Sequence, residues 1–403
     1  MLRRMLIAFG AACAAASAQS FMREVTTIYA FTSSTDGANP YGGVIFAPDG
    51  TIYGTTDAGG SPQNNGVIYS LTPPTTPGGA WTETILWDPA YPAGTNSYAT
   101  LALDANGVLY GTLFGGANSG NGSVFSLHPP ASPGGAWTPQ VLHRFAGSPD
   151  GASPTSGVIL GPGGILYGTT SEGGQANAGA VYSLQVSGGT VTETVLYSFT
   201  GDADGGNPFG PLTLGPGGVL YGAARFGGAA DYGCVFQLTP PASPGGAWTE
   251  QVLYSFSGSP DGYPIGGVAL GANGVLYGAT FGIPASNNSY GNVYQLAPAP
   301  GETWTYTNIR SFTDKVNDAA DPVGLTLGAN GVLYGVAFTG KTPLFMLTPP
   351  AVAGQPWTET PLAQTKKSFA PVVVGPDGAL YGVSFGEFGS PSNAGSVVRV
   401  SLQ

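Results

Sequence analysis

Charged residues are scarce in this chain of 403 residues. Lys, Arg, Asp and Glu together make up only 8% of it, whereas an average soluble protein has about 25%. The 11 basic residues are outnumbered by 22 acidic ones, so the formal net charge at pH 7 is −11. Binding to a phosphate backbone or to anionic lipid requires clustered positive charge. The composition therefore argues against a nucleic-acid partner and against a membrane-surface partner.

Histidine and cysteine are almost absent. His128 and His143 are the only histidines, and they fall in different parts of the repeat described below. A histidine metal site or a Ser-His-Asp triad is therefore not expected. Cys13 lies in the N-terminal leader, where lipidation is the less favoured alternative, and Cys234 then has no disulfide partner. Hydrophobic residues make up 42% of the chain and aromatic residues 11%, which suffices for a core without disulfides.

No hydrophobic run is long enough to span a bilayer, which requires about 20 apolar residues. The N-terminus instead has the pattern of a secretory signal peptide. Arg3 and Arg4 precede an apolar run over 5–16, and small residues lead up to Ala18. We predict that residues 1–18 form a signal peptide and that the mature protein is extracellular or periplasmic. No C-terminal anchor motif is recognisable, which favours free secretion.

A short tyrosine-glycine signature recurs seven times at the end of a hydrophobic run. It reads TIYGTT at its first occurrence, and successive copies lie 57, 57, 54, 56, 57 and 47 residues apart. A regular period of this length indicates a repeat architecture, so we predict a single repeat domain over 19–403. The signature tyrosines are Tyr53, Tyr110, Tyr167, Tyr221, Tyr277, Tyr334 and Tyr381.

Each repeat contains four strand signals separated by turn residues. An aliphatic run such as 157–160 comes first. The turn after it contains Asn-Gly, Asp-Gly or Gly-Gly, which supply the positive φ angles that a two-residue hairpin needs. The tyrosine signature is the second strand, a run such as 66–71 the third, and a run such as 81–87 the fourth. Seven units of four antiparallel strands predict an all-β, seven-bladed β-propeller.

The two ends of the array are offset by one strand. Residues 24–31 have a fourth-strand pattern but precede the first complete unit, and the chain ends on a third strand at Val400. We predict that residues 24–31 complete the last blade and close the ring, which leaves no unpaired edge at the ends of the array. An open β-solenoid is the alternative, although its coils are usually much shorter than this period.

The full repeat unit resembles a known family. It reads LYGTT…GG…G-x-V-F/Y-x-L-T-P…W-T-E-T-V-L-Y-S-F…D-G-x-x-P and is similar to the GloVer tandem repeat of secreted bacterial proteins that carry varied surface anchors. The resemblance covers essentially the whole mature chain. It implies an exported, propeller-like repeat protein, and it brings no catalytic residues because no activity is established for the family.

The position four residues after the signature tyrosine varies in polarity, although the surrounding repeat does not. Its charged residues come from different blades and could converge on one face of the ring, while its phenylalanines could stack on a sugar ring. The competing interpretation is that the phenylalanines pack between blades and the charged residues are solvated. Together with the residue that follows it, this position gives the candidate binding residues Asp57, Phe114, Glu172, Arg225, Phe226, Phe281, Phe338 and Phe385.

A calcium site is a weaker candidate. Asp202 and Asp204 have the spacing of part of a calcium-binding loop, but the downstream acidic ligand of an EF-hand is missing. We favour a turn in which the aspartate side chains bond nearby amides, and we expect no metal or other cofactor.

These features predict a secreted, non-enzymatic, monomeric binding protein whose partner is an extracellular glycan or a protein. The predicted binding face combines the connections that enter each blade with the loops that follow the tyrosine signature. The alternative is an extracellular polysaccharide hydrolase or lyase that uses Asp57, Glu172 or other carboxylates of this face as acid and base. Such an enzyme needs two carboxyl groups that face one pocket. The fold alone does not separate the two functions.

Overall fold

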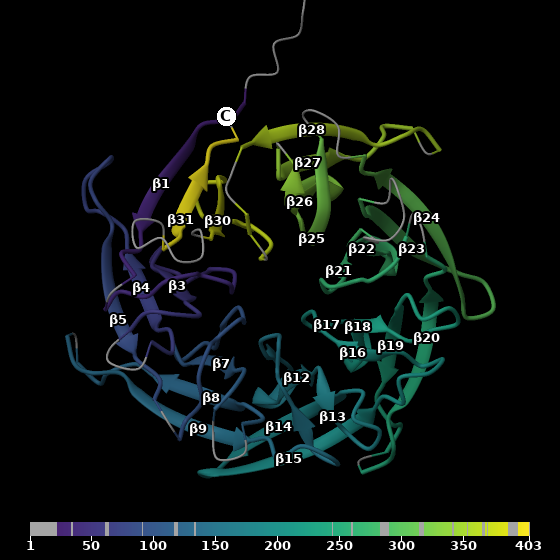
Figure 1. The fold of residues 1–403 in the computed structure, drawn as a ribbon, viewed down its shortest axis with the longest axis horizontal. Coiled ribbons are helices and arrows are strands. Elements are labelled where there is room, and N and C mark those ends of the chain that lie inside the picture. Colours follow the sequence, from purple (N-terminus) through teal and green to yellow (C-terminus); the bar gives the residue numbers. More distant parts are fainter. Residues whose placement is uncertain are drawn as a thin grey trace, which may run out of the picture.

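The chain forms a ring of seven antiparallel sheets around a central axis (Figure 1). The predicted all-β, seven-bladed propeller is confirmed. This computed structural model describes residues 22–402 except 34, 61–63, 91, 117–119, 133, 244, 259–260, 283–289, 314–317, 341, 353, 365–366, 369 and 386–393. The predicted signal peptide lies outside the described residues.

Each blade has four strands that follow one another from the axis outward. Blade 1 contains β2 (Ile45–Phe46), β3 (Ile52–Thr55), β4 (Ile68–Thr72) and β5 (Thr82–Trp87). Blade 2 contains β6 (Ala102–Leu103), β7 (Leu109–Leu113), β8 (Ser123–His128) and β9 (Thr138–Arg144). Blade 3 contains β11 (Ile159–Leu160), β12 (Leu166–Thr170), β14 (Ala180–Ser187) and β15 (Thr190–Ser198). Blade 4 contains β17 (Thr213–Leu214), β18 (Leu220–Phe226), β19 (Cys234–Thr239) and β20 (Thr249–Ser255). Blade 5 contains β21 (Ala269–Leu270), β22 (Leu276–Thr280), β23 (Asn292–Ala299) and β24 (Thr303–Ser311). Blade 6 contains β25 (Ala319–Leu327), β26 (Leu333–Gly340), β27 (Leu344–Thr348) and β28 (Thr358–Ala363).

Blade 7 joins the two ends of the chain. It contains β29 (Val373–Val374), β30 (Leu380–Ser384), β31 (Ser396–Val400) and, outermost, β1 (Val25–Ala30). β1 pairs antiparallel with β31, so that Val25 lies opposite Val400. Figure 1 shows the purple N-terminal strand outside the yellow C-terminal one. The predicted closure of the ring by residues 24–31 is confirmed.

The inner hairpins are one residue longer than predicted. In blade 3 the amide of Gly161 donates to the carbonyl of Ile165 at 2.8 Å, which encloses the three-residue turn η1 (Pro162–Gly164). Gly163 and Gly164 supply the expected positive φ angles of 70° and 75°. The two-residue prediction was wrong because the proline before these glycines also belongs to the loop. The inner hairpins of the other six blades are closed by the equivalent hydrogen bond. Their turns include η2 (Pro216–Gly218), η3 (Ala272–Gly274) and η4 (Ala329–Gly331).

The glycine of the signature is explained by an aromatic ring on the neighbouring third strand. Gly222 lies directly opposite Phe236, and a Cβ atom on Gly222 would come within 2.4 Å of the ring atom Cζ of Phe236. Blade 7 differs because Gly382 faces Val398. The equivalent pairs in the other blades are Gly54–Tyr69, Gly111–Phe125, Gly168–Tyr182, Gly278–Tyr294 and Gly335–Phe345.

The same ring also carries the contact between blades. The side chain of Phe199, just after the outer strand of blade 3, lies edge-on against Phe236 of blade 4, with ring centroids 5.0 Å apart. Both side chains are fully buried. The contact recurs as Phe31–Tyr69, Phe145–Tyr182, Phe256–Tyr294 and Phe312–Phe345, and Trp87 takes the corresponding place against Phe125. The hydrophobic core of the described chain is accordingly divided into seven clusters, each at a junction between neighbouring blades.

A polar cluster lies beside the core at five of these junctions. In the connection from blade 3 to blade 4, the carboxylate of Asp204 accepts hydrogen bonds from the hydroxyl of Tyr197 and from the backbone amide of Thr200, both at 2.9 Å. Glu250 of blade 4 lies near enough for Asp204 to affect its pKa. Asp204 therefore stabilises the turn into the next blade. The aspartates at the equivalent positions are Asp36, Asp150, Asp261 and Asp318.

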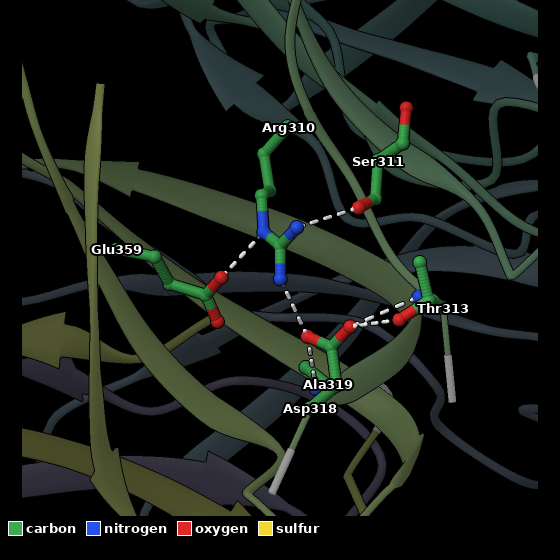
Figure 2. A network of polar contacts seen from close by, with 6 residues as sticks. All are labelled: Arg310, Ser311, Thr313, Asp318, Ala319 and Glu359. Atoms are coloured by element: carbon green, nitrogen blue, oxygen red, sulfur yellow. Dashed lines mark hydrogen bonds and ion pairs between the residues drawn. The ribbon is translucent and has the colours of Figure 1, made fainter. Parts of the chain in front are cut away.

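At the junction of blades 5 and 6 the cluster contains an arginine (Figure 2). Arg310 of β24 is paired with Asp318 at 2.9 Å and also with Glu359 of β28. Asp318 in turn accepts a hydrogen bond from the amide of Thr313 at 3.0 Å. One guanidinium thus connects the outer strands of two blades and the turn between them.

The glutamates of these clusters should make stability depend on pH. Burial, and then the nearby Asp36 carboxylate, raise the pKa of Glu83 to about 7, and burial with Asp204 does the same for Glu250. Between the ordinary value of 4.5 and 7, the folded protein binds protons that the unfolded chain releases. The free energy of unfolding should therefore be larger at pH 5 than at pH 8. The lowered pKa of Asp150, caused by hydrogen bonds from His143 and two backbone amides that outweigh burial, acts only at lower pH.

The double variant Glu83→Gln/Glu250→Gln should reduce this difference between pH 5 and pH 8, as measured by chemical denaturation. Both glutamates are partly exposed, so screening limits the size of the effect. Glu24→Gln removes an exposed carboxylate and should leave the pH dependence unchanged. A wild-type protein that is equally stable at both pH values would contradict the assignment.

Replacement of the signature glycine should be costly only where an aromatic ring covers it. Gly222→Ala places a methyl group against the ring of Phe236, and we expect the free energy of unfolding to fall by about 1–3 kcal/mol. Gly382→Ala is the matched control, because its nearest neighbour is a methyl group of Val372 at 3.0 Å, and its loss should be clearly smaller. Equal losses in denaturant titrations would contradict the role of the ring.

Candidate functional site

A cavity of about 1290 Å³, called the central channel below, lies at the centre of the ring. Its wall is formed mainly by the innermost strands and carries aliphatic side chains, such as those of Ile45, Leu103 and Leu160. These strands begin the blades and are short, for example two residues in β2 and β11. The aliphatic wall makes the channel largely apolar.

The mouth of the channel is built on a backbone corner that recurs at the entry to the blades. In blade 2 the corner residue Asn96 has a φ of 57°, and its carbonyl accepts a 2.9 Å hydrogen bond from the amide of Phe114. This bond fixes the residue four positions after the signature tyrosine beside the corner. The same hydrogen bond joins Asn39 to Asp57, Ser153 to Ser171 and Tyr263 to Phe281.

Two side chains per blade vary on this constant backbone. One is the residue four positions after the signature tyrosine, and the other lies two positions after the corner residue. A fixed backbone with variable side chains is the arrangement expected of a recognition surface. The channel residues at the second position are Tyr41, Tyr98, Thr155, Phe209, Ile265 and Val323.

Four of the eight residues predicted from the sequence line the channel, namely Phe114, Arg225, Phe226 and Phe281. Two others pack directly behind rings at its mouth. Phe385 lies 4.2 Å from Tyr41 between ring centroids, and Phe338 lies 6.2 Å from Phe281.

The two acidic candidates lie outside the channel lining. Asp57 is only 8% exposed. It accepts a 2.9 Å hydrogen bond from the side-chain amide of Asn96 and another from the hydroxyl of Tyr98. Burial raises the pKa of Asp57, although both hydrogen bonds oppose the rise. Asp57 therefore holds Tyr98 and the corner of blade 2 in place.

Glu172 is exposed and belongs to the short strand β13 (Glu172–Gly173), which pairs with β10 (Gly151–Ala152). Its carboxylate accepts a 3.2 Å hydrogen bond from the hydroxyl of Ser153. Over the part of the chain that the structure describes, no Asp or Glu lines the channel. The structure thus brings together the aromatic candidates and Arg225, but not the two carboxylates.

Arg225 is the only charged residue in the described channel lining. It lies near the end of β18, which is held by β16 (Gly206–Pro208) as well as by β17. The guanidinium carbon lies 5.0 Å from the ring centroid of Phe226 and 5.9 Å from that of Phe209, which are cation–π distances. The Nε atom is buried and has no hydrogen-bond partner.

Tyr263 stands out among the corner residues. Its φ is 55°, in the left-handed region, which asparagine tolerates but a bulky residue adopts only under strain. Its ring packs against Phe226 at 5.8 Å and Tyr232 at 5.6 Å and lines the channel. A strained aromatic residue at a cavity mouth points to a functional role.

A second cavity, of about 530 Å³, does contain two carboxylates. It lies at the outer junction of blades 2 and 3 and is lined by Asp150 and Glu193. Burial, and then Asp150, raise the pKa of Glu193. This pair corresponds to Asp204 and Glu250 of the polar clusters described above. We therefore assign it to the contact between blades.

The calcium candidates are part of the same outer architecture. Asp204 is the aspartate of the junction cluster, and the carbonyl of Asp202 accepts hydrogen bonds from the amides of Gly205 and Gly228. Within the described ranges, no group of three or more His, Cys, Asp or Glu residues is placed to hold a metal ion.

No described helix is long and apolar enough to cross a membrane.

Sequence reasoning missed the aromatic residues at the blade entries, namely Tyr41, Tyr98, Phe209 and Tyr263. The available signal was the D-G-x-x-P segment. Five of the seven copies contain its proline, and the residues before and after that proline vary, as they do after the signature tyrosine.

Solved structures resemble this ring at low sequence identity, which shows the fold alone. An ancestral GH74 enzyme matches with a TM-score of 0.56 and 14% identity, over 91% of this chain and 48% of that one. The extracellular domain of a protein named as a hybrid two-component system from B. thetaiotaomicron matches with a TM-score of 0.55 and 12% identity, over 94% and 41%. PorZ, a surface component of the type-IX secretion system of Porphyromonas gingivalis, matches with a TM-score of 0.51 and 13% identity, over 90% and 46%. This chain therefore spans less than half the length of each of these neighbours.

No curated protein matches the chain. A family of repeats does match it, over residues 76–281, which is just over half of the sequence. The matched region contains copies of the signature and the outer-strand motif on which the resemblance to the GloVer repeat was based. The chain belongs to the Gloeobacter/Verrucomicrobia repeat family.

Proposed function

We propose that this protein is an exported, non-enzymatic binding protein that holds a glycan at the mouth of its central channel. The observation that carries the proposal is the composition of the mouth. Aromatic side chains are mounted there on a constant backbone, and no carboxylate is found in the described lining. The signal-peptide pattern of residues 1–18 supports export.

The aromatic side chains form two groups around the channel. On blades 7, 1 and 2, the rings of Phe385, Tyr41, Tyr98 and Phe114 follow one another at centroid distances of 4.2, 5.0 and 5.1 Å. On blades 4 and 5, Tyr263 and its neighbours form the second group. The apolar C–H faces of sugar rings stack on such surfaces. The cavity exceeds the roughly 300–1,000 Å³ of small-molecule pockets, so an oligosaccharide end fits it better than a single metabolite does.

The hydrolase or lyase alternative needs an acid and a base that face the bound sugar. Asp57 is the nearest candidate in the fold, because it lies behind Tyr98 and its pKa is raised by burial. Its carboxylate already accepts two hydrogen bonds and does not line the channel. The purified protein can be assayed for the release of new reducing ends from a glycan that it binds. If release occurs and Asp57→Asn abolishes it, the hypothesis of an enzyme replaces that of a non-enzymatic binding protein.

The first test is a glycan array with the purified mature protein, followed by titration calorimetry with the glycan that binds best. Phe226→Ala should weaken binding by about five- to thirtyfold, which corresponds to the loss of an aromatic side chain that the bound glycan would cover. Phe226 is 39% exposed, so its removal should leave the unfolding midpoint nearly unchanged. Val352→Ala, at a 66% exposed side chain outside the channel, is the control and should bind as wild type. Absence of binding to any glycan would refute the proposal.

Tyr263→Asn should separate stability from binding. Asparagine tolerates the left-handed backbone that tyrosine occupies here at a φ of 55°, so the free energy of unfolding should stay the same or rise by up to about 1 kcal/mol. The variant should nevertheless bind the glycan more weakly, because the ring is gone. Tyr263→Ala loses the ring but keeps the backbone strain, and it should be less stable than Tyr263→Asn. If the two variants unfold at the same denaturant concentration, the strain argument is wrong.

A further inference from the structure

The environment of the Arg225 guanidinium is not explained by the stability of the fold. Over the described residues the ion pairs involve His143, Arg310 and Arg399 but not Arg225. Its Nε atom is buried without a hydrogen-bond partner. A buried donor without a partner costs free energy. Arg225 as a whole is only partly buried and lines the channel, so a ligand in the cavity can reach the remainder of its side chain.

The position of Arg225 is fixed before any ligand arrives. It lies on β18 between two residues that pair with β16, since Ala224 is opposite Pro208 and Phe226 is opposite Gly206. The rings of Phe226 and Phe209 flank the guanidinium at 5.0 and 5.9 Å. A strand residue held between rings loses little conformational freedom on binding, which favours affinity.

Charge complementarity identifies the ligand class. The protein carries a net charge of −11, yet the described lining of its channel contains one arginine and no acidic residue. A second cation, the ammonium of Lys367, lies 5.1 Å from the ring centroid of Phe338 behind the channel mouth. The planar donor fork of arginine matches a carboxylate with two parallel hydrogen bonds. A neutral sugar would leave this charge uncompensated.

We infer that the channel mouth binds an acidic oligosaccharide, in which the carboxylate of a uronic acid residue pairs with Arg225 while the sugar ring stacks on the adjacent aromatic side chains. This inference rests on the proposed glycan-binding function and specifies its ligand. The aromatic rings supply contact with the apolar face of the sugar, and Arg225 selects for the acid. Phe226 and Tyr263 are the rings best placed for stacking, because they lie beside each other and line the same cavity.

The test compares trigalacturonate with its fully methyl-esterified form by titration calorimetry. The two probes have the same sugar rings and differ only at the carboxyl groups, where esterification adds a methyl group and removes the negative charge. The comparison in wild-type protein does not depend on any variant. We expect the acid to bind at least about tenfold more tightly than the ester, as befits a charge-assisted hydrogen-bonded pair.

Arg225→Gln should bind both probes equally and weakly. Arg225→Lys should retain part of the preference, because a point charge replaces the fork. Arg144→Gln removes the same unit of charge from an exposed arginine of β9, whose Nε donates to the carbonyl of Pro92. It should keep the full preference for the acid. Circular dichroism and the unfolding midpoint establish that the variants are folded.

The outcomes separate this inference from the proposed function. If wild-type protein binds acid and ester equally, or binds only neutral glycans of the array, the acidic ligand is refuted while glycan binding stands. If Arg225→Gln keeps the preference for the acid, the assignment of the carboxylate to Arg225 is refuted. If no glycan of either kind binds, the inference and the proposed function both fail.

Discussion

The contact between a ring on the third strand and the glycine opposite it on the second strand supports the rest of the structure. In blade 4 the ring of Phe236 occupies the space above Gly222 and also contacts Phe199 of the preceding blade edge-on. One side chain thus fixes the packing within a blade and the packing between blades. Because the contact is buried and recurs around the ring, each blade is positioned by its neighbours. A ring of sheets joined in this way needs no disulfide, and the free Cys234 is simply buried in the core.

The outer and inner parts of the ring have different tasks. At the outer junctions, polar clusters such as Arg310 with Asp318 and Glu359 (Figure 2) tie the turns between blades to the outer strands. Toward the axis, the strands are short and their side chains aliphatic, so the centre remains open. The mouth of this opening takes its shape from backbone corners that do not depend on the exposed side chains. Side chains at the mouth are therefore free to vary without loss of the fold, which is why recognition can be placed there.

The site could be predicted only in part from the sequence. Phe114, Arg225, Phe226 and Phe281 were found because they occupy a position that varies within a constant repeat, and the structure places them at the channel. Asp57 met the same criterion, yet its carboxylate is turned to Asn96 and Tyr98. The pattern shows which positions are free to vary, whereas the direction of a side chain depends on hydrogen bonds to residues about 40 positions away. Tyr263 was not among the predicted site residues, and its strained backbone is visible only in three dimensions.

The sequence by itself determined the number of blades, the order of their strands and the closure of the ring. These properties follow from the period of the signature and from the one-strand offset between the two ends, and both are local patterns read along the chain. It did not determine the length of the inner hairpins, because the proline before the two glycines can belong either to the strand or to the loop. Only the tertiary structure decided what lines the channel, since that surface is assembled from residues of all seven blades. The position of Arg225 between two rings and its lack of an ion pair among the described residues are properties of that assembly, and they depend on how the blades pack around the axis.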